Sequence, residues 1–418
     1  MYQLKHLLHR VTPPAVFAWY HFALALLGAV RYGFPAKKIV VIGVTGTKGK
    51  SSTTEYINAI CEAAGKKTAV SNSIRFKVGA TERRNTTRMS MPGRFGMQAF
   101  LREAADAQCD IAILEMTSEG AAQSRHRFIA LDALVFTNLA PEHIESHGSL
   151  EKYIDAKLSI GKELARSPKR PRIMVVNDHD AISEKFLALS TELPIRFALE
   201  HATPWTTNGS GGTFTYKGTP VSVHFPGQFS LENALAAAEV CGALGITPDA
   251  VAHGIGNLTR IPGRAEKVDA GQSFDVYVDY AHNPSSLEAL FSSFPAQKKI
   301  CIVGSTGGGR DIWKRPEMGR IAGQLCDEVI VTNEDPYDED PEAIINAIAS
   351  GVKDRKPTIC LDRREAIAKA CRMAQPGDVV LITGKGTDPN IRIQNGKSIP
   401  WSDFEVAKEE LVKLRATQ

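Results

Sequence analysis

Residues 43–54 contain the residue types that bind nucleotide phosphates. They read GVTGTKGKSSTT and lie between an apolar run typical of a strand and a run typical of a helix. Gly46 and Gly49 allow backbone N–H groups to curl around phosphate oxygens, and the helix start adds a partial positive charge. Lys50 can reach the outer phosphates, and the Ser51 hydroxyl can hold Mg²⁺. The stretch therefore predicts an ATP-binding phosphate loop.

Three more side chains could take part in chemistry at that loop. Glu115 ends the apolar run IAILE, where its carboxylate can face a magnesium ion, although a single acid there is also typical of a protein surface. His143 and Lys157 follow in the stretch TNLAPEHIESHGSLEKYIDAK. Imidazole is an uncommon ligand for magnesium, and a helical lysine taken alone is an ordinary basic residue.

These residues need a scaffold that gathers the ends of strands. From Lys38 onward, short apolar runs alternate with helical stretches, as in a parallel sheet wrapped by helices. Residues 203–223 are rich in Gly, Thr and Pro and predict a hairpin excursion, and the turn formers at 257–264 mark a boundary. We expect strands within 38–44, 111–116, 133–138, 173–177, 276–281, 299–304, 328–333 and 378–384. The fold class is α/β: a hydrophobic N-terminal helical segment at 1–37, a central parallel-sheet ATP-binding domain at 38–260 and a Rossmann-like C-terminal domain at 261–418.

The amino-acid composition limits the kinds of molecule that the protein is expected to bind. The 418 residues carry a formal net charge of +4 with 23% charged residues, a weak and dispersed excess that indicates no nucleic-acid partner. The seven cysteines are scattered singly, with no pair at metal-ligand or redox spacing. We expect buried thiols and a cytoplasmic protein.

The N-terminal apolar run is the unusual segment of the chain. Residues 15–30 read AVFAWYHFALALLGAV, with Lys5 and Arg10 before them and Arg31 after them. A membrane span needs about 20 apolar residues, so the run is short for one. It predicts a helix packed on its own domain or an interfacial helix that attaches residues 12–34 to the inner face of the membrane.

The phosphate loop and the motifs after it resemble those of the Mur ligases and their relatives, the polyglutamate synthetases. In this resemblance TGTKGKS is the family's ATP loop, with Lys48 where Asn is usual. EMTSEGAAQSR resembles the signature of the ligases that add the third residue to UDP-N-acetylmuramoyl-dipeptide. The loop residues implied to bind ATP are Thr45, Gly46, Thr47, Lys48, Gly49, Lys50, Ser51 and Ser52, and those implied to bind the acceptor are Ser90, Thr117, Ser118, Gln123 and Arg125.

The resemblance also implies how the reaction is catalysed. Catalysis would rest on Lys50, Glu115, His143 and Lys157, and two Mg²⁺ ions would be held by Ser51, Glu115, His143 and Lys157. The family lysine that matches Lys157 is carbamylated by CO₂, which turns a cation into an anion that magnesium attracts. Glu142 and Glu145 replace the usual aspartates.

Further motifs of the family follow toward the C-terminus. Asn233, Arg264, Asp279 and Asn283 match residues that contact ATP, and Arg310 and Lys314 match residues that hold the substrate carboxylate and phosphate. The residues implied for the amino-acid site are Asn333, Asp335, Tyr337, Lys385 and Asp388. Diaminopimelate-adding enzymes typically have Arg at the place of Tyr337, so this substrate is disfavoured. The acids of TNEDPYDEDP could receive the side-chain amine of lysine or ornithine, or could form a solvated acidic loop.

The implied activity is an ATP-dependent acid–amino-acid ligase of peptidoglycan synthesis that acts as a monomer on a muramoyl-peptide-like acceptor. Classical members have about a hundred residues before the ATP loop domain, to bind the UDP group, whereas some 37 precede the first strand here. The acceptor could therefore be UDP-linked, lipid-linked or another. A polyglutamate-type synthetase, a P-loop kinase and a non-catalytic nucleotide-binding scaffold are the alternatives.

Overall fold

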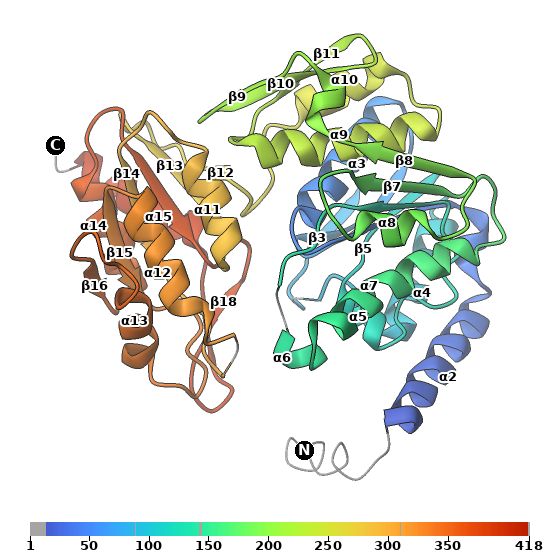
Figure 1. Cartoon of the computed structure of the whole chain (residues 1–418), viewed down its shortest axis with the longest axis horizontal. Helices are drawn as coiled ribbons and strands as arrows, with labels where there is room; N and C mark the ends of the chain where they lie inside the picture. The colour runs from blue at the N-terminus through green and yellow to red at the C-terminus, as the bar shows by residue number, and fades with distance from the viewer. Residues whose placement is uncertain (1–13, 88, 142–143, 310, 417–418) are drawn as a thin grey trace. The chain divides into compact units, whose positions relative to one another are not determined.

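The structure is a computed structural model that describes residues 14–87, 89–141, 144–309 and 311–416 (Figure 1). These residues form two compact units. The first comprises the chain up to Leu139 with His147–His201 and Leu235–Gly254, and the second comprises Ala140–Ser146, Ala202–Ala234 and the chain from Ile255. The chain thus passes between the units more than once. The predicted domain bounds at 37/38 and 260/261 stay a prediction.

The first unit is built on a mostly parallel sheet with the strand order β4-β3-β2-β5-β1-β6-β7-β8. Strands β2, β5, β1, β6, β7 and β8 run parallel, and β3 and β4 return antiparallel at one edge. The strands expected in this unit are confirmed. The strands are β1 (Val40–Thr45), β2 (Thr68–Ser71), β3 (Arg75–Val78), β4 (Thr81–Arg84), β5 (Ile111–Glu115), β6 (Ala133–Phe136), β7 (Ile173–Asn177) and β8 (Leu193–Phe197).

The central strands of this sheet are buried on both faces, as continuous apolar runs in a parallel sheet require. Val41 and Leu114 pack with Phe100 and Leu164 of the covering helices. On the other face α3 contacts β1, β2 and β5. The helices are α3 (Lys50–Ala63), α4 (Arg94–Asp106), α5 (Ser118–Ala122), α6 (Ile144–His147), α7 (Leu150–Ala165), α8 (Ser183–Leu187), η2 (Leu199–Ala202), α9 (Gln228–Ala243) and α10 (Pro248–Asn257), of which α6, η2, α9 and α10 reach into the second unit.

The second unit has its own sheet, with the order β12-β13-β17-β14-β15-β16. All pairs are parallel except β12 with β13. The strands expected here are confirmed as well. They are β12 (Glu266–Lys267), β13 (Asp275–Asp279), β14 (Lys299–Val303), β15 (Glu328–Thr332), β16 (Thr358–Cys360) and β17 (Val379–Thr383).

Alternation along β14 directs side chains to two helical layers. Cys301 and Val303 pack with one group of helices, α11 to α13, whereas Ile300 and Ile302 pack with α14 and α15. Figure 1 shows these helices on both faces of the orange and red sheet. The helices are α11 (Pro284–Ser292), α12 (Lys314–Leu325), α13 (Pro341–Ala349), α14 (Arg363–Met373) and α15 (Asp403–Ala416).

Two small antiparallel sheets belong to the second unit. The predicted excursion at 203–223 is confirmed as β9 (Thr206–Asn208), β10 (Gly211–Tyr216) and β11 (Thr219–Val223). Near the C-terminus β18 (Asn390–Arg392) pairs with β19 (Ser398–Pro400).

The N-terminal apolar run forms helix α2 (Pro14–Tyr32), followed by the short helix η1 (Pro35–Lys38). Helix α2 packs on α4, and Gly28 lies at this contact, where an added Cβ would be 3.4 Å from the carbonyl oxygen of Arg94, an ordinary van der Waals distance. The expectation that this helix packs on its own domain is confirmed. Among the described residues, no helix has both the length and the apolar character to cross a bilayer.

The expectation that the cysteines are separate thiols is wrong for one pair. Cys301 and Cys326 form a disulfide with their sulfur atoms 2.04 Å apart, across a sequence separation of 25. Cys301 lies in β14 and Cys326 directly after α12, which packs on that strand. Tertiary packing brings them together, so their spacing in the sequence gave no sign of the pair.

Candidate functional site

The predicted phosphate loop connects β1 to α3 at the carboxyl edge of the first sheet. Gly46 and Gly49 adopt φ angles of 149° and 79°, of which the second lies in the left-handed region that favours glycine. An added Cβ on Gly46 would lie 2.0 Å from the Thr137 hydroxyl oxygen. Thr137 and Asn138 fix the loop from the end of β6: the Thr137 hydroxyl donates to the Lys48 carbonyl at 2.6 Å, and the Lys48 N–H donates to Asn138 Oδ1 at 3.0 Å.

Ser51 and Glu115 meet beside this loop. The Ser51 hydroxyl donates to Glu115 Oε2 at 2.8 Å, and the backbone N–H of Ser73 donates to the same oxygen at 3.0 Å. The Ser90 hydroxyl donates to the other carboxylate oxygen at 2.8 Å. Glu115 is thus a buried carboxylate at the end of β5, and the Ser51 hydroxyl from the first turn of α3 is its neighbour. Hydroxyl and carboxylate oxygens are ligands that Mg²⁺ prefers, so this pair fits a metal ion bound to nucleotide phosphates.

Two lysines contact carbonyl oxygens of the loop. Lys50 Nζ donates to the carbonyl oxygen of Thr47 at 2.9 Å. Lys157, only 2% exposed, donates to the carbonyl oxygen of Gly46 at 2.6 Å, and its Nζ lies 4.7 Å from the centre of the Tyr153 ring. The Tyr153 hydroxyl shares a hydrogen bond of 2.8 Å with Thr47 Oγ1. Lys157 is therefore part of the loop's surroundings and not a surface base.

His147 lies in the same region, although it was not among the residues predicted from the sequence to have a role. Its Nε2 is 3.1 Å from the hydroxyl oxygen of Ser118, and its ring centre is 5.3 Å from that of Tyr153. The histidine in the stretch ESHG was a signal that could have identified it. Ser73, from the turn between β2 and β3, was also missed, because nothing in its local sequence indicates that it reaches Glu115.

The predicted acceptor residues gather at α5 and the turn after it. Thr117 caps α5 by accepting a hydrogen bond of 3.1 Å from the Gly120 N–H. Arg125 donates to the Met91 carbonyl at 2.6 Å and to Gln123 Oε1 at 2.8 Å. Burial lowers the pKa of Arg125, and the nearby positive charge of Arg94 lowers it further. Two guanidinium groups in a partly buried place favour a negatively charged ligand such as a peptide carboxylate.

In the second unit, one group of predicted residues surrounds the end of β13 and the turn after it. The Arg264 guanidinium lies 4.5 Å from the centre of the Tyr280 ring. Asp279 accepts hydrogen bonds from the N–H groups of Ala265 at 2.6 Å and Ala281 at 2.7 Å. Burial raises the pKa of Asp279, and the charge of Arg264 opposes that rise. Asn283 has a structural role, since its side chain caps α11 through the Ser286 N–H at 3.0 Å. Asn233 is buried in α9.

Another group lies at the carboxyl ends of β15 and β17. Lys385 Nζ is 2.7 Å from Asp335 Oδ1 and 3.4 Å from Asp388 Oδ2, and all three residues are buried. Glu334, only 3% exposed, accepts a hydrogen bond of 2.8 Å from the Thr306 hydroxyl. Its other oxygen, Oε2, is buried and has no hydrogen-bond partner among the described residues. A solvated acidic loop is therefore wrong for Glu334 and Asp335, because the strand ends enclose both; Asp338 and Asp340 are exposed.

The remaining predicted site residues lie outside these groups. The side chain of Lys314 is buried at the start of α12, Asn333 accepts a bond from Arg363 through its backbone carbonyl, and Tyr337 has a left-handed φ of 55°. Glu145 accepts a hydrogen bond of 2.6 Å from the Asp311 N–H. His143, Glu142 and Arg310 lie outside the described residues.

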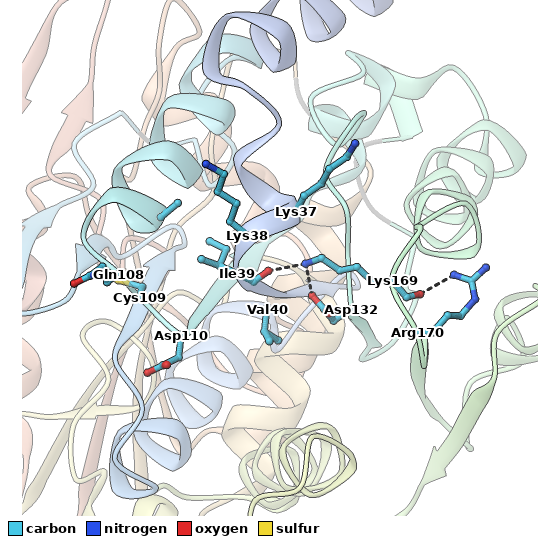
Figure 2. Close-up of a pocket in the computed structure, with 11 residues that line it drawn as sticks. Lys37, Lys38, Ile39, Val40, Gln108, Cys109, Asp110, Asp132, Lys169 and Arg170 are labelled. Atoms are coloured by element: carbon cyan, nitrogen blue, oxygen red, sulfur yellow. Dashed lines mark hydrogen bonds and ion pairs between the residues drawn. The ribbon is translucent and has the colours of Figure 1, made fainter.

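A cavity of about 660 Å³ lies at the opposite, amino edge of the first sheet. It is lined by residues that precede β1, β5, β6 and β7, among them Lys37, Lys38, Asp132 and Lys169 (Figure 2). Asp132 and Lys169 form an ion pair of 2.7 Å. The residues predicted for catalysis are not part of its lining.

Comparison with known proteins places the chain in a family. The Mur ligase middle domain matches residues 44–241, and the Mur ligase glutamate ligase domain matches residues 263–386. The UDP-N-acetylmuramoyl-L-alanyl-D-glutamate–2,6-diaminopimelate ligase of Syntrophomonas wolfei is 35% identical over 407 residues, which cover 93% of this chain and 81% of that protein. The chain belongs to the Mur ligase family. A UDP-N-acetylmuramyl-tripeptide synthetase of Roseiflexus is likewise 35% identical to this Mur ligase, over 94% of the chain and 82% of that protein.

Solved structures share the fold of this Mur ligase. A structure of UDP-N-acetylmuramoyl-L-alanyl-D-glutamate–2,6-diaminopimelate ligase matches with a TM-score of 0.62 and 25% identity, over 90% of this chain and 79% of that one. The Mycobacterium tuberculosis folylpolyglutamate synthase complexed with ADP matches with a TM-score of 0.70 over 92% and 96% of the two chains; at 19% identity it shows the fold alone. The predicted resemblance and fold class are confirmed, while the roles of the individual site residues stay predictions.

Proposed function

We propose that this Mur ligase uses ATP to join a carboxylate of a muramoyl-peptide-like acceptor to the amine of an amino acid, in peptidoglycan precursor synthesis. ADP and phosphate are the other products. The observation that carries the proposal is the 2.8 Å contact between Ser51 and Glu115 beside a glycine-rich loop. This pair of oxygen atoms supports a metal site next to the nucleotide's phosphates, and Lys50 and Lys157 both donate hydrogen bonds to carbonyl oxygens of that loop.

The loop residues hold the triphosphate. Backbone N–H groups of residues 46–51 and the start of α3 attract the phosphate oxygens, and Lys50 exchanges its bond to Thr47 for one to an outer phosphate. Ser51 and Glu115 would hold a magnesium ion, which would supply positive charge to balance the phosphates. Ser90 and Ser73 keep the Glu115 carboxylate in one orientation through bonds to its two oxygens.

The reaction has two steps. An oxygen of the acceptor carboxylate attacks the γ-phosphorus, the bond from that phosphorus to the β-phosphate oxygen breaks, and ADP leaves an acyl phosphate behind. The amine then attacks the acyl carbon, loses a proton, and the carbon–oxygen bond to phosphate breaks. Arg125 is suited to hold the acceptor's negative charge during these steps, because its partly buried guanidinium strengthens contacts with a carboxylate.

Lys157 is the proposed site of a carbamate. A neutral lysine amine adds to CO₂ with formation of an N–C bond and loss of one proton, which gives an anion at the Gly46 end of the loop. The buried position of Lys157 supports this assignment, because an anion there would attract the second magnesium ion that His143 is predicted to bind. The roles of Asn233, Arg264, Asp279 and Asn283 in ATP binding stay predictions.

For the amino acid we propose a basic side chain, as in lysine or ornithine. The buried and unpaired Oε2 of Glu334 supports this, because an ammonium group would supply the missing hydrogen bond. The Lys385 ammonium group forms ion pairs with Asp335 and Asp388. These pairs are suited to fix the conformation of the chain at the same strand ends. Tyr337 offers no charge to a second carboxylate, which disfavours diaminopimelate.

We propose that the enzyme is a cytoplasmic monomer attached to the inner face of the membrane through residues 12–34, of which 12 and 13 lie outside the described residues. A UDP-linked and a lipid-linked acceptor are both compatible with this location. The exposed apolar residues of α2 support the attachment.

A phosphate-release assay tests the proposed reaction. Muramoyl-dipeptide acceptors, with and without UDP, are combined with a panel of amino acids, and phosphate is measured with ATP and Mg²⁺ present. The proposal expects phosphate only when acceptor and amine are both present, and expects Lys50→Ala to abolish it while the exposed control Lys66→Ala does not. Phosphate release that is independent of the amine would contradict a ligase.

A further inference from the structure

Helix α2 is apolar on two sides. Ala25 and Ala29 are buried on the side that packs on α4. On the opposite side a row of large apolar residues with helical spacing is open to solvent; we call it the outer stripe. Its members, with their exposed fractions, are Val16 (53%), Trp19 (74%), Tyr20 (55%), Leu27 (57%) and Val30 (59%).

One apolar face is enough for a helix that packs on its own domain. A second one of this size indicates another contact, because contiguous exposed apolar surface is unfavourable in water. Tryptophan and tyrosine, two of the five members, are the side chains that prefer the boundary between water and lipid.

The N-terminal segment that contains the stripe has charges of one sign in its sequence. No aspartate or glutamate precedes Glu55 in the sequence. Arg31 at the end of α2, and Lys37 and Lys38 directly after it, are all exposed. Apolar side chains followed directly by cations, in a segment whose sequence has no acids, are complementary to a bilayer that contains anionic phospholipid.

The same two lysines also line the cavity at the amino edge of the first sheet (Figure 2). Lys169 and Arg170 line it as well, whereas its acids already have partners: Asp132 pairs with Lys169 at 2.7 Å, and Asp110 accepts a bond of 2.8 Å from the Lys67 N–H. Cations therefore outnumber acids around a space of about 660 Å³. Such a space attracts a phosphate group.

A chain of contacts joins α2 to the predicted acceptor residues. Arg94 of α4 lies with its guanidinium 5.9 Å from the centre of the Tyr20 ring and is hydrogen-bonded to His21. The same side chain donates to the carbonyl oxygen of Gln123 at 3.0 Å, two residues before Arg125. A bilayer that covers the outer stripe would thus contact helix α2, which is linked through Arg94 to the predicted acceptor residues.

We infer that the outer stripe and the basic cavity form one lipid-binding surface, with the stripe among the acyl chains and the cavity holding the phosphate of an anionic phospholipid headgroup. The inference rests on the proposed membrane attachment and names the lipid class and the residues that recognise it. The helix lies along the bilayer surface, because its inner side is held by α4.

Vesicle flotation of the full chain tests the inference. Vesicles of phosphatidylcholine alone are compared with vesicles that also contain phosphatidylglycerol, at low and high salt. We expect binding to the anionic vesicles, weakened by salt. Trp19→Gln with Leu27→Gln and Val30→Gln should abolish it, whereas the matched control Ile359→Gln with Ile399→Gln and Val412→Gln, which changes exposed residues of the second unit, should not.

The contribution of the cavity to vesicle binding is tested by removing the positive charges of its lysines. Lys37→Gln with Lys38→Gln should weaken binding to anionic vesicles by about twenty-five-fold, on the order of a five-fold factor for each cation. The exposed pair Lys353→Gln with Lys356→Gln is the control. Free glycerol phosphate should compete for the cavity and lower vesicle binding; no competition would show that the lysines act only through the surface charge, and would overturn the headgroup site.

Two outcomes would overturn the surface as a whole. One is equal binding of wild type and the stripe variant to anionic vesicles. The other is a dimer of the wild type that the stripe variant converts to a monomer, with no vesicle binding, since the stripe would then be a protein interface. The assay needs no catalysis, and phosphate release with a soluble acceptor measures the ligase independently. Failure of one therefore differs visibly from failure of the other.

Discussion

The Ser51 hydroxyl donates a hydrogen bond to Glu115 Oε2 at 2.8 Å, across 64 residues of sequence. The pair forms because β1 and β5 are parallel neighbours, with Val44 opposite Glu115 in the register. The loop after β1 and the carboxylate at the end of β5 therefore emerge at the same edge of the sheet. This relationship converts a phosphate-binding loop into a site that can also hold a metal ion.

Replacing Glu115 by Gln should reduce phosphate release by at least about a hundred-fold, the scale at which loss of a charge-stabilising group acts. The amide keeps the shape of the side chain but removes the negative charge that attracts Mg²⁺. The Mg²⁺ concentration needed for half of the remaining activity should rise. Glu103→Gln, an exposed acid of α4, serves as the control, and equal activity of the two variants would contradict the metal role.

Lys157→Arg should inactivate the enzyme, because guanidinium keeps the positive charge but does not form a carbamate. With ¹³C-bicarbonate, the wild type should give a carbamate signal in the NMR spectrum. The signal should persist in Lys162→Arg, an exposed residue of the same helix, and vanish in Lys157→Arg. A wild type without the signal, and with activity unaffected by removal of CO₂, would exclude the carbamate.

Glu334→Gln should raise KM for a basic amino acid by about ten-fold or more while changing KM for ATP little. The substitution removes the charge that pairs with the substrate's side-chain ammonium. The exposed Asp338→Asn controls for a general change in local charge. If both variants keep the wild-type amino-acid KM, the buried carboxylate does not select the substrate.

Acid should destabilise the first unit through His126. Burial lowers the pKa of His126 from 6.5 to about 3, with a smaller contribution from the charge of Arg127. Below pH 6.5 the unfolded chain therefore binds a proton at His126, whereas the folded chain keeps this histidine neutral. The contribution of His126 to the free energy of unfolding is complete above pH 6.5 and is lost as pH falls toward 3. The loss of stability reaches at most about 5 kcal/mol.

Urea unfolding at a series of pH values measures this effect. The free energy of unfolding of the wild type should fall more steeply between pH 6.5 and 4 than that of His126→Gln, by up to about 1.4 kcal/mol per pH unit. His179→Gln, at an exposed position, should keep the wild-type slope. Parallel pH curves for wild type and His126→Gln would show that His126 does not cause the acid sensitivity.

The sequence predicted those parts of the site that depend on strand order. Glu115 and Ser51 could be paired from it because parallel strands end at one edge, and the loop glycines are visible as residue types. Ser73 could not, since it reaches Glu115 from the turn into β3, an antiparallel return that no local pattern indicates. The Cys301–Cys326 disulfide and the burial of Glu334 likewise arise from packing between elements distant in the chain.

The sequence also did not predict which side of helix α2 is exposed. An almost wholly apolar run predicts a helix, but it does not show which side packs on the protein. Packing on α4 buries Ala25 and Ala29 and leaves Trp19, Leu27 and Val30 exposed. Only the packed structure separates the two sides.

Transfer of labelled oxygen tests the central claim most directly. The acceptor carboxylate is labelled with ¹⁸O, the enzyme is given ATP, Mg²⁺ and the amino acid, and the released phosphate is analysed by mass spectrometry. If the acyl phosphate forms at the Ser51–Glu115 site, each phosphate released with a new amide carries one oxygen from the acceptor. Unlabelled phosphate, released together with amide, would contradict the account.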